Sequence, residues 1–203
     1  MVKVGIVALQ GGVAEHYHMV RLAGERSGIP AEPVIVKKPG QLEGLDAIII
    51  PGGESTTIGV VARRVGLLEP LRDALLSGTP ALGTCAGAII MAKRVTAGSK
   101  GGQPLLGVMD VEVHRNYFGR QRESFELDLR IDFLDEKPFR GVFIRAPAFT
   151  DFWASARPAA TARIDGSEVH VAAVEGGLVA TSFHPELTGD TRIHEYLLRL
   201  AKR

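Results

Sequence analysis

Apolar residues in the first half of the chain form short continuous runs, which alternate with stretches where they recur every three or four positions. Continuous runs of this kind are typical of strands buried on both faces of a parallel sheet. The runs cover residues 2–9, 32–40, 45–53 and 80–84. The stretches that predict helices cover 13–28, 54–78 with an interruption near Gly66 or Pro70, and 85–95. This alternation predicts βαβ units, with a mostly parallel sheet and helices on both faces.

The second half of the chain has a different pattern. Apolar and polar residues alternate over 106–133, which predicts antiparallel strands with one wet face. Strand character continues through 141–149, 168–177 and 178–187, and "EGG" between the last two runs predicts a hairpin turn. The final residues, 190–203, predict an amphipathic helix with a basic end. With no repeat and no linker in the pattern, we expect one α/β domain over 1–203, with three layers and antiparallel strands in its C-terminal half.

Composition narrows the class of protein. The formal net charge is +1, which gives no electrostatic reason to expect binding to nucleic acid or to an anionic membrane. No apolar run approaches the roughly 18 residues that a membrane-spanning helix needs. The chain has a single cysteine, so it cannot form an internal disulfide, and this suits a reducing cytoplasm. The first apolar run ends in a Gly-Gly turn, so we expect a strand there and not a signal peptide.

The single cysteine, Cys85, lies in "GTCAG", between a predicted strand and a predicted helix. Glycines at 83 and 87 suit a sharp turn that leaves space only for small neighbours, the thiol version of a nucleophile elbow. The backbone N–H of Ala86 would point the same way as the sulfur and could donate to an oxyanion. The alternative is an inert cysteine buried at a helix start, and the elbow alone leaves both open.

A nucleophilic thiol needs a base, and one of the six histidines has a suitable context. His184 and Glu186 flank Pro185 at the end of a predicted strand. Extended geometry before a proline would place the two side chains on one side, where the carboxylate can orient the imidazole. By itself this pair could be a solvated strand end. Together with Cys85 it favours nucleophilic catalysis.

A glycine pair in "PGGESTT" follows the buried run at 45–50. Glycine lets the backbone approach a ligand closely, so the N–H of Gly53 could complete an oxyanion hole. The alternative is a simple helix start capped by Ser55 or Thr56. No Gly-Lys-Ser/Thr follows, which argues against a phosphate loop. The histidines are scattered, and we expect no metal and no cofactor.

These motifs together resemble the class I (triad) glutamine amidotransferases, with "GTCAG" as the elbow and "HPE" as its partner. In order along the chain, the motifs also resemble the glutaminase subunits of pyridoxal 5'-phosphate synthases. They are "LQGGVAEH", "PGGESTT", "GTCAG", "RNYFGRQRESFE", "GVFIRAP" and "SFHPELT", and they extend from Gln10 to Thr188. The resemblance implies a flavodoxin-like glutaminase fold, with L-glutamine as the substrate and hydrolysis through a thioester on Cys85.

The resemblance also implies further residue roles. Gly53, Glu54, Ser55, Arg115, Ile144 and Arg145 would line the glutamine site, and Gln10 would face a partner subunit. That partner would be a barrel-shaped synthase in a large ring, which consumes the ammonia. Two alternatives remain at this point: the glutaminase of another amidotransferase, such as imidazole glycerol phosphate synthase, and a DJ-1-like redox or chaperone protein. The first would share the triad but not "FGRQ" or "FIRAP", and "HPE" argues against the second.

Overall fold

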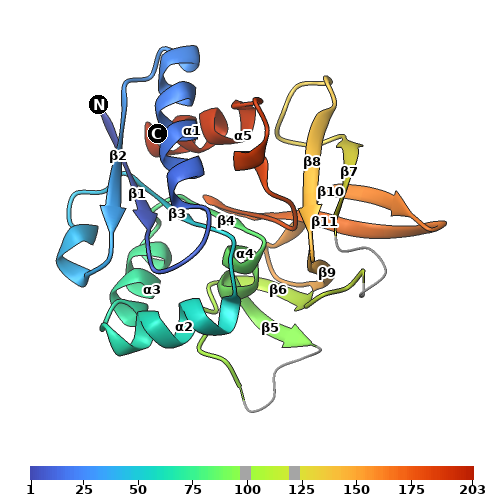
Figure 1. The fold of residues 1–203 in the computed structure, drawn as a ribbon, viewed down its shortest axis with the longest axis horizontal. Helices are drawn as coiled ribbons and strands as arrows, with labels where there is room; N and C mark the ends of the chain where they lie inside the picture. The colour runs from blue at the N-terminus through green and yellow to red at the C-terminus, as the bar shows by residue number, and fades with distance from the viewer. Residues whose placement is uncertain (97–101, 119–123) are drawn as a thin grey trace.

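A computed structural model of the chain describes residues 1–96, 102–118 and 124–203. Most of its strands form one large sheet (Figure 1). From edge to edge, this sheet contains β2 (Ala31–Val36), β1 (Val2–Val7), β3 (Ala47–Ile50), β4 (Ala81–Thr84), β12 (Leu178–Thr181), β11 (Ser167–Glu175), β9 (Ala148–Phe152), β6 (Met109–His114) and β5 (Ala92–Thr96), with β10 (Arg157–Ile164) paired to β11. The antiparallel pair of β7 (Ser124–Leu129) and β8 (Phe139–Ile144) forms a second sheet.

The large sheet divides into a parallel part and a mixed part. The five strands β2, β1, β3, β4 and β12 run parallel to one another. Beyond them β11 is antiparallel to β12, β9 and β10, and β9 is antiparallel to β6. This arrangement confirms the predicted fold class, including the antiparallel strands in the C-terminal half. It also places the C-terminal ends of β1, β3, β4 and β12 along one edge of the sheet, where sites in α/β proteins form.

Helices cover both faces of the parallel part and make three layers (Figure 1). On one face lie α1 (Val13–Ser27) and α5 (Arg192–Ala201), and on the other lie α2 (Ser55–Arg64), α3 (Leu68–Leu76) and α4 (Ala86–Met91). The central strand β3 shows why the sequence demands both layers. Ala47 and Ile49 enter the core beneath α1 and α5, whereas Ile48 and Ile50 enter the core beneath the other helices. Alternating side chains of one apolar run are thus buried on opposite faces.

The predicted interruption of the helical stretch 54–78 is confirmed, and the predicted helix 85–95 is shorter in the structure. The stretch 54–78 is interrupted at Gly66, whose φ of 72° is left-handed and ends α2. Pro70 does not break α3, because it lies in the first turn, where its missing N–H is not needed. The predicted helix 85–95 was wrong beyond Met91, since the chain continues as β5 and pairs with β6. Strand pairing overrides helical spacing here, and the β-branched Val95 and Thr96 suit it.

The predicted "EGG" hairpin is confirmed, with Glu175 paired to Leu178 across the turn. The sequence analysis did not assign β10, which forms a long hairpin with β11. Short 3₁₀ turns lie at η1 (Pro39–Leu42) and η2 (Pro185–Leu187). In the "FGRQ" motif at 118–121, residues 119–121 fall outside the described residues.

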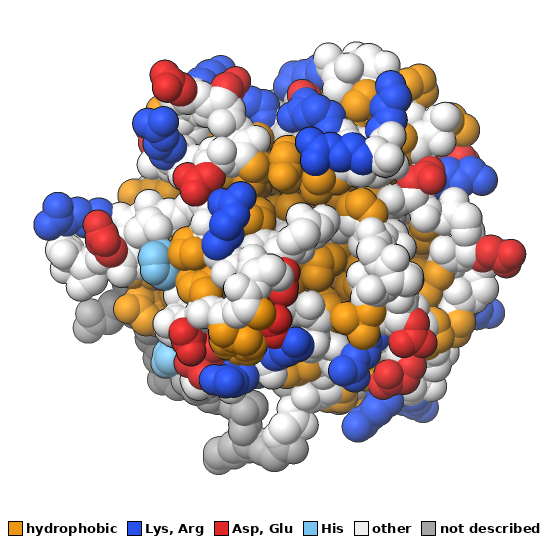
Figure 2. Space-filling view, turned by 180° about the vertical axis from the view of Figure 1, so that it is seen from behind, with side chains coloured by type: hydrophobic (Ala, Val, Ile, Leu, Met, Phe, Trp, Pro, Cys, Tyr) orange, Lys and Arg blue, Asp and Glu red, His pale blue; other side chains and the backbone are white. Residues whose placement is uncertain are grey.

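Charges of both signs are interspersed over the surface seen in Figure 2, in keeping with the net charge of +1. None of the described helices is both long enough and apolar enough to cross a bilayer.

Candidate active site

Cys85 occupies a sharp turn between β4 and α4. Its φ of 49° and ψ of −102° lie outside the usual regions for a residue with a side chain. Such a conformation costs roughly 1–3 kcal/mol and persists only when its surroundings impose it. Two backbone hydrogen bonds do so: the Cys85 N–H donates to the Thr181 carbonyl at 2.7 Å, and the Ile89 N–H donates to the Cys85 carbonyl at 3.2 Å. The residue is held on an elbow, as the sequence predicts.

The two glycines that flank the elbow are required by contact. A β-carbon at Gly83 would lie 2.5 Å from the sulfur of Met91 and 2.9 Å from the carbonyl of Gly87. A β-carbon at Gly87 would lie 2.0 Å from the carbonyl oxygen of Ile50. Any side chain at either position would push α4 away from β3 and β4. The G-x-C-x-G spacing therefore reflects the close packing of the helix against two strand ends.

His184 and Glu186 are held side by side, although not by the predicted extended geometry. The chain turns into the 3₁₀ segment η2 directly after His184. His184 itself is anchored by its N–H, which donates to the Val142 carbonyl of β8 at 2.8 Å. The Nδ1 atom of His184 lies 2.8 Å from Oε1 of Glu186. Because the Glu186 side chain is only 1% exposed, its carboxylate is fixed against the imidazole.

Gly52 brings the histidine and the cysteine into one site. A β-carbon on Gly52 would lie 2.5 Å from Cε1 of His184 and 3.4 Å from Cβ of Cys85, so both side chains pack on this glycine. The sulfur of Cys85 lies 3.9 Å from the carbonyl oxygen of Ile144. The ends of β3, β4, β8 and β12 thus converge on the thiol.

The charges in the site support one another. Burial lowers the pKa of His184, but hydrogen bonding and charge attraction from Cys85 and Glu186 outweigh burial and raise the pKa to about 10. Burial raises the pKa of Glu186, but attraction from His16 and His184 outweighs burial and holds the pKa well below its ordinary value. At neutral pH the site therefore holds an imidazolium beside a carboxylate. The imidazolium can give its proton to a leaving group.

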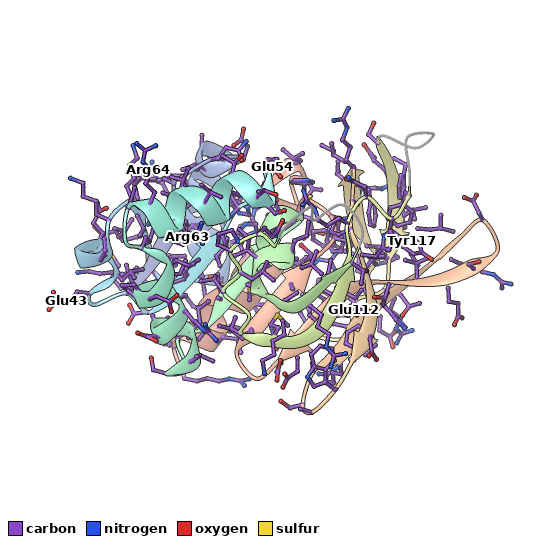
Figure 3. All side chains as sticks on the ribbon, turned by 90° about the horizontal axis from the view of Figure 1, so that it is seen from below. Glu43, Glu54, Arg63, Arg64, Glu112 and Tyr117 are labelled. Atoms are coloured by element: carbon purple, nitrogen blue, oxygen red, sulfur yellow. The ribbon has the colours of Figure 1, made fainter. Side chains whose placement is uncertain are left out.

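Glu54, directly after the glycine loop at Gly52 and Gly53, forms a charged pair with Arg115. The carboxylate of Glu54 caps α2 by accepting from the N–H groups of Thr56 and Thr57, so Glu54 is the helix cap, not Ser55 or Thr56. Figure 3 shows Glu54 at this end of α2, with Arg63 and Arg64 toward the other end. Nη2 of Arg115 donates to Oε1 of Glu54 at 3.0 Å.

Gln103, which the sequence analysis missed, ties this pair to the loop. Its Oε1 accepts from Nη1 of Arg115 at 2.9 Å, from Ser55 Oγ at 3.2 Å and from Thr56 Oγ1 at 3.1 Å. Gln103 lies in a stretch without a periodic pattern, so only the three-dimensional structure could place it. The predicted residues Glu54, Ser55 and Arg115 are thus brought together.

Gln10 contacts the glycine loop directly. Its Oε1 accepts from the Glu54 N–H at 2.7 Å, and a β-carbon on Gly53 would lie 2.8 Å from the same oxygen. Gln10 is exposed, so it joins the protein surface to the loop. A β-carbon on Gly11 would lie 1.6 Å from the Gly52 carbonyl oxygen, which therefore points to Gly11. Because the C=O and N–H of a trans peptide point in opposite directions, the Gly53 N–H points away from Gly11.

Two buried histidines on the far side of Glu186 were also missed by the sequence analysis. His16 lies 3.4 Å from Oε2 of Glu186, and its ring contacts His194 and Thr84. A sequence pattern could have found His16, because it shares the apolar stripe of α1 with Met19, Val20 and Ala23. A titratable residue on a buried stripe needs a partner. Among the described residues, no group of three or more His, Cys, Asp or Glu side chains has the geometry of a metal site.

A thiol on a strained elbow, an imidazole backed by a carboxylate and a glycine loop, all at the C-terminal edge of a parallel sheet, define a cysteine-nucleophile hydrolase of the triad amidotransferase class. The model of one family, described as the SNO glutamine amidotransferase family, matches residues 6–203. The chain belongs to that family. It is an enzyme, a glutaminase that takes the amide nitrogen of glutamine.

Relatives of high identity carry one name. A protein of Aeropyrum pernix named pyridoxal 5'-phosphate synthase subunit PdxT is 60% identical over 204 residues, which cover 99% of this chain and 100% of the relative. A PdxT of Staphylothermus marinus is 54% identical over 198 residues, which cover 97% of each chain. A solved structure described as a glutamine amidotransferase superposes with a TM-score of 0.83 at 45% identity and covers 98% of this chain and 99% of its own. The resemblance drawn from the motifs is confirmed, and the two alternatives are set aside.

The packing on Gly52 predicts that Gly52→Ala lowers glutaminase activity by about 100-fold or more, because a shift of about 1 Å in a reacting group has this effect. The new methyl group would displace the imidazole of His184, whereas the buried sheet is untouched. Gly40→Ala is the matched control, since a β-carbon there meets nothing within 4 Å. Steady-state kinetics of both variants checks the prediction, and equal activity in the two would contradict it.

The raised pKa of His184 predicts a pH-dependent contribution to stability. A group with a raised pKa in the folded state contributes fully below its unfolded value of 6.5, and this contribution is lost as the pH rises toward about 10. The difference in unfolding free energy between the wild type and His184→Asn should therefore shrink over that window. Urea denaturation of both proteins across the window measures it. A difference that stays constant or grows with pH would show that His184 is not held as an imidazolium.

Proposed function

We propose that this chain, as one domain over residues 1–203, is the glutaminase subunit of a pyridoxal 5'-phosphate synthase and uses Cys85, His184 and Glu186 as its triad. The observation that carries the triad is the 2.8 Å contact of His184 with Glu186 beside the strained thiol. The PdxT relatives, aligned over nearly the whole chain, support the synthase. The single thiol and the absence of a membrane-spanning helix among the described residues suit an enzyme of the cytoplasm.

The first half of the reaction releases ammonia. The Cys85 sulfur attacks the side-chain amide carbon of glutamine, and a tetrahedral oxyanion forms. The N–H groups of Gly53 and Ala86 donate to this oxyanion; Ala86 begins α4, where the helix itself offers its N–H no acceptor. The C–N bond then breaks, and the imidazolium of His184 gives its proton to the leaving nitrogen. Ammonia and a glutamyl thioester on Cys85 result.

The second half hydrolyses the thioester. Neutral His184 now takes a proton from water, and the hydroxide attacks the thioester carbon. The C–S bond breaks, glutamate leaves and the resting pair of thiolate and imidazolium is restored. Glu186 holds the imidazole orientation through both halves and stabilises its charged form.

The charged pair beside the loop suits the amino-acid end of glutamine. Burial raises the pKa of Glu54, but hydrogen bonds from Thr57 and Thr56 outweigh it and lower the pKa to about 2, so the carboxylate stays ionised. Glu54 can attract the α-ammonium group of glutamine, and Arg115 can attract the α-carboxylate. Ser55, Ile144 and Arg145 complete the site in this proposal.

Ammonia made here needs a consumer, which we place in a barrel-shaped synthase that forms a large ring. Gln10 is the contact we assign to that partner, because this exposed residue binds the loop that carries Gly53. Movement at Gln10 would be passed through this hydrogen bond to the Gly53–Glu54 peptide, which adjoins the Gly52–Gly53 peptide. A peptide between two glycines rotates at low steric cost, so docking can switch the oxyanion donor on.

Triad variants test the chemistry. Cys85→Ala should abolish release of glutamate from glutamine, His184→Asn should be nearly as damaging, and Glu186→Gln less so. The order follows from the roles, since His184 moves the proton and Glu186 only orients it. Circular dichroism checks that each variant is folded. Near-normal hydrolysis by folded Cys85→Ala would refute the triad, and a larger loss in Glu186→Gln than in His184→Asn would refute the assigned roles.

The proposed switch of the oxyanion donor by docking, called the gate below, is tested by comparing the chain alone with the chain plus synthase. Loss of one oxyanion donor lowers the rate roughly 10²–10³-fold, so saturating synthase should raise the glutaminase rate by up to that factor. Gln10→Ala should weaken the activation, and Gln41→Ala, a glutamine of η1, is the matched control. Equal rates with and without synthase would rule out the gate and leave the triad standing.

A further inference from the structure

A buried polar cluster on the far side of Glu186 has no part in the reaction described above. It contains His16 of α1, His194 of α5 and Thr84 at the end of β4, and all three are at most 1% exposed. Nε2 of His16 lies 3.4 Å from Oε2 of Glu186 and 3.2 Å from Oγ1 of Thr84. Nδ1 of His16 lies 3.0 Å from Nε2 of His194. Thr84 Oγ1 also accepts from the Gly52 N–H at 3.0 Å, so the cluster touches the loop below His184.

The pattern of partners determines which ring nitrogens carry protons. Nδ1 of His194 is buried and has no hydrogen-bond partner among the described residues. If Nδ1 of His16 were the donor to His194, the proton of neutral His194 would have to sit on that unpartnered atom. A buried N–H without an acceptor is more costly than a buried acceptor without a donor. The favoured arrangement therefore has the His194 Nε2–H donating to Nδ1 of His16.

This arrangement leaves Nε2 of His16 as the protonated atom, and it lies 3.2 Å from Oγ1 of Thr84 and 3.4 Å from Oε2 of Glu186. Oε2 of Glu186 is buried and makes no hydrogen bond with the described residues, and Nε2 of His16 faces it at 3.4 Å as an ion-pair contact. The opposite tautomer would place a lone pair of His16 against the carboxylate. A donor that faces a carboxylate is instead attracted by its charge. Burial lowers the pKa of His194 to about 3, so His194 remains a neutral donor.

We infer that His16, oriented by His194, is a positioning residue for the reaction: its Nε2–H holds the second oxygen of Glu186, so that the first oxygen is held against His184. The inference rests on the proposed role of Glu186 in the triad. The relay joins α5, α1, η2 and the imidazole of His184 through two hydrogen bonds, His194–His16 and Glu186–His184, and the 3.4 Å contact of His16 with Glu186. It gives the carboxylate a partner on each oxygen, which fixes both its rotation and its charge.

Asparagine and glutamine at position 16 give a matched pair. The side-chain nitrogen of glutamine can reach the place of Nε2 and keep the donor to Glu186, whereas asparagine reaches only the place of Nδ1. We expect His16→Asn to lower kcat by about tenfold or more with little change in KM, because the contact of a donor with the charged carboxylate is lost and substrate binding is not. His16→Gln should recover most of that loss. His18→Asn, an exposed change on the same helix, should match the wild type.

The pH profile separates positioning from a general loss of structure. Without His16, the pKa of Glu186 should rise toward its ordinary value. As the pH is lowered, kcat of His16→Asn should therefore begin to fall at a higher pH than kcat of the wild type. Other titratable groups also lie near Glu186 and are unchanged in His16→Asn. They are His184 on its own segment, Cys85 after β4, His194 on α5, and Glu15 and His18 on α1. His18→Asn controls for the rim. A loosened fold would instead lower kcat equally at all pH values.

The experiment measures kcat, KM and their pH profiles with saturating synthase. The series is wild type, His16→Asn, His16→Gln, His18→Asn, Glu186→Gln and Cys85→Ala. Wild-type kcat and an unshifted profile in His16→Asn, with Glu186→Gln impaired, would overturn the inference and leave the triad intact. Full activity in Glu186→Gln would overturn the triad role and this inference with it.

If the His16 variants do not fold, nitrogen chemical shifts of the histidines in the wild-type protein give the answer. A protonated Nε2 on His16 supports the relay, and an unprotonated Nε2 overturns it.

Discussion

The contact between Gly52 and the imidazole of His184 is the one on which the rest of the site depends. It exists because β3 ends without a side chain at the point where β4 turns through Cys85 and the segment after β12 returns with His184. Similar close approaches occur at Gly83 and Gly87, which let α4 lie against β3 and β4, and at Gly11, which lies against the Gly52 carbonyl. Glycine is therefore used here for space more than for flexibility. The strained backbone of Cys85 is the consequence, since four strand ends hold the thiol in a turn that it would not adopt alone.

The electrostatics follow from this close packing. Glu186 is nearly removed from water, and a buried carboxylate is tolerated only when donors surround it. His184 is hydrogen-bonded to one oxygen and His16 lies 3.4 Å from the other, so the carboxylate that contacts the His184 imidazole is itself contacted from behind. On the solvent side, the Glu54–Arg115 pair is organised by Gln103 and by the start of α2. The turn at Cys85 thus lies between the buried pair of His184 and Glu186 and the charged pair of Glu54 and Arg115. This arrangement is suited to a small zwitterionic substrate.

Sequence patterns predicted the parts that are local in the chain. The run at 45–50 predicted the buried strand β3, the glycines around Cys85 predicted the elbow, and the H-P-E spacing predicted the pairing of His184 with Glu186. The parts that depend on distant residues were missed or wrong. Residues 92–96 became a strand because β6 offered a partner, and η2 formed where an extended segment was expected. His16 and Gln103 find their partners only after folding brings together segments far apart in the chain, which no local pattern records.

The central claim is that Cys85 is the nucleophile toward the glutamine side chain. A diazoketone analogue of glutamine, which alkylates a nucleophile positioned for the amide carbon, tests it most directly when incubated with the chain and its synthase. Peptide mass spectrometry should find one adduct, on the peptide that contains Cys85, and an excess of glutamine should suppress it. An adduct on a different residue, or loss of activity with Cys85 unmodified, would contradict the account.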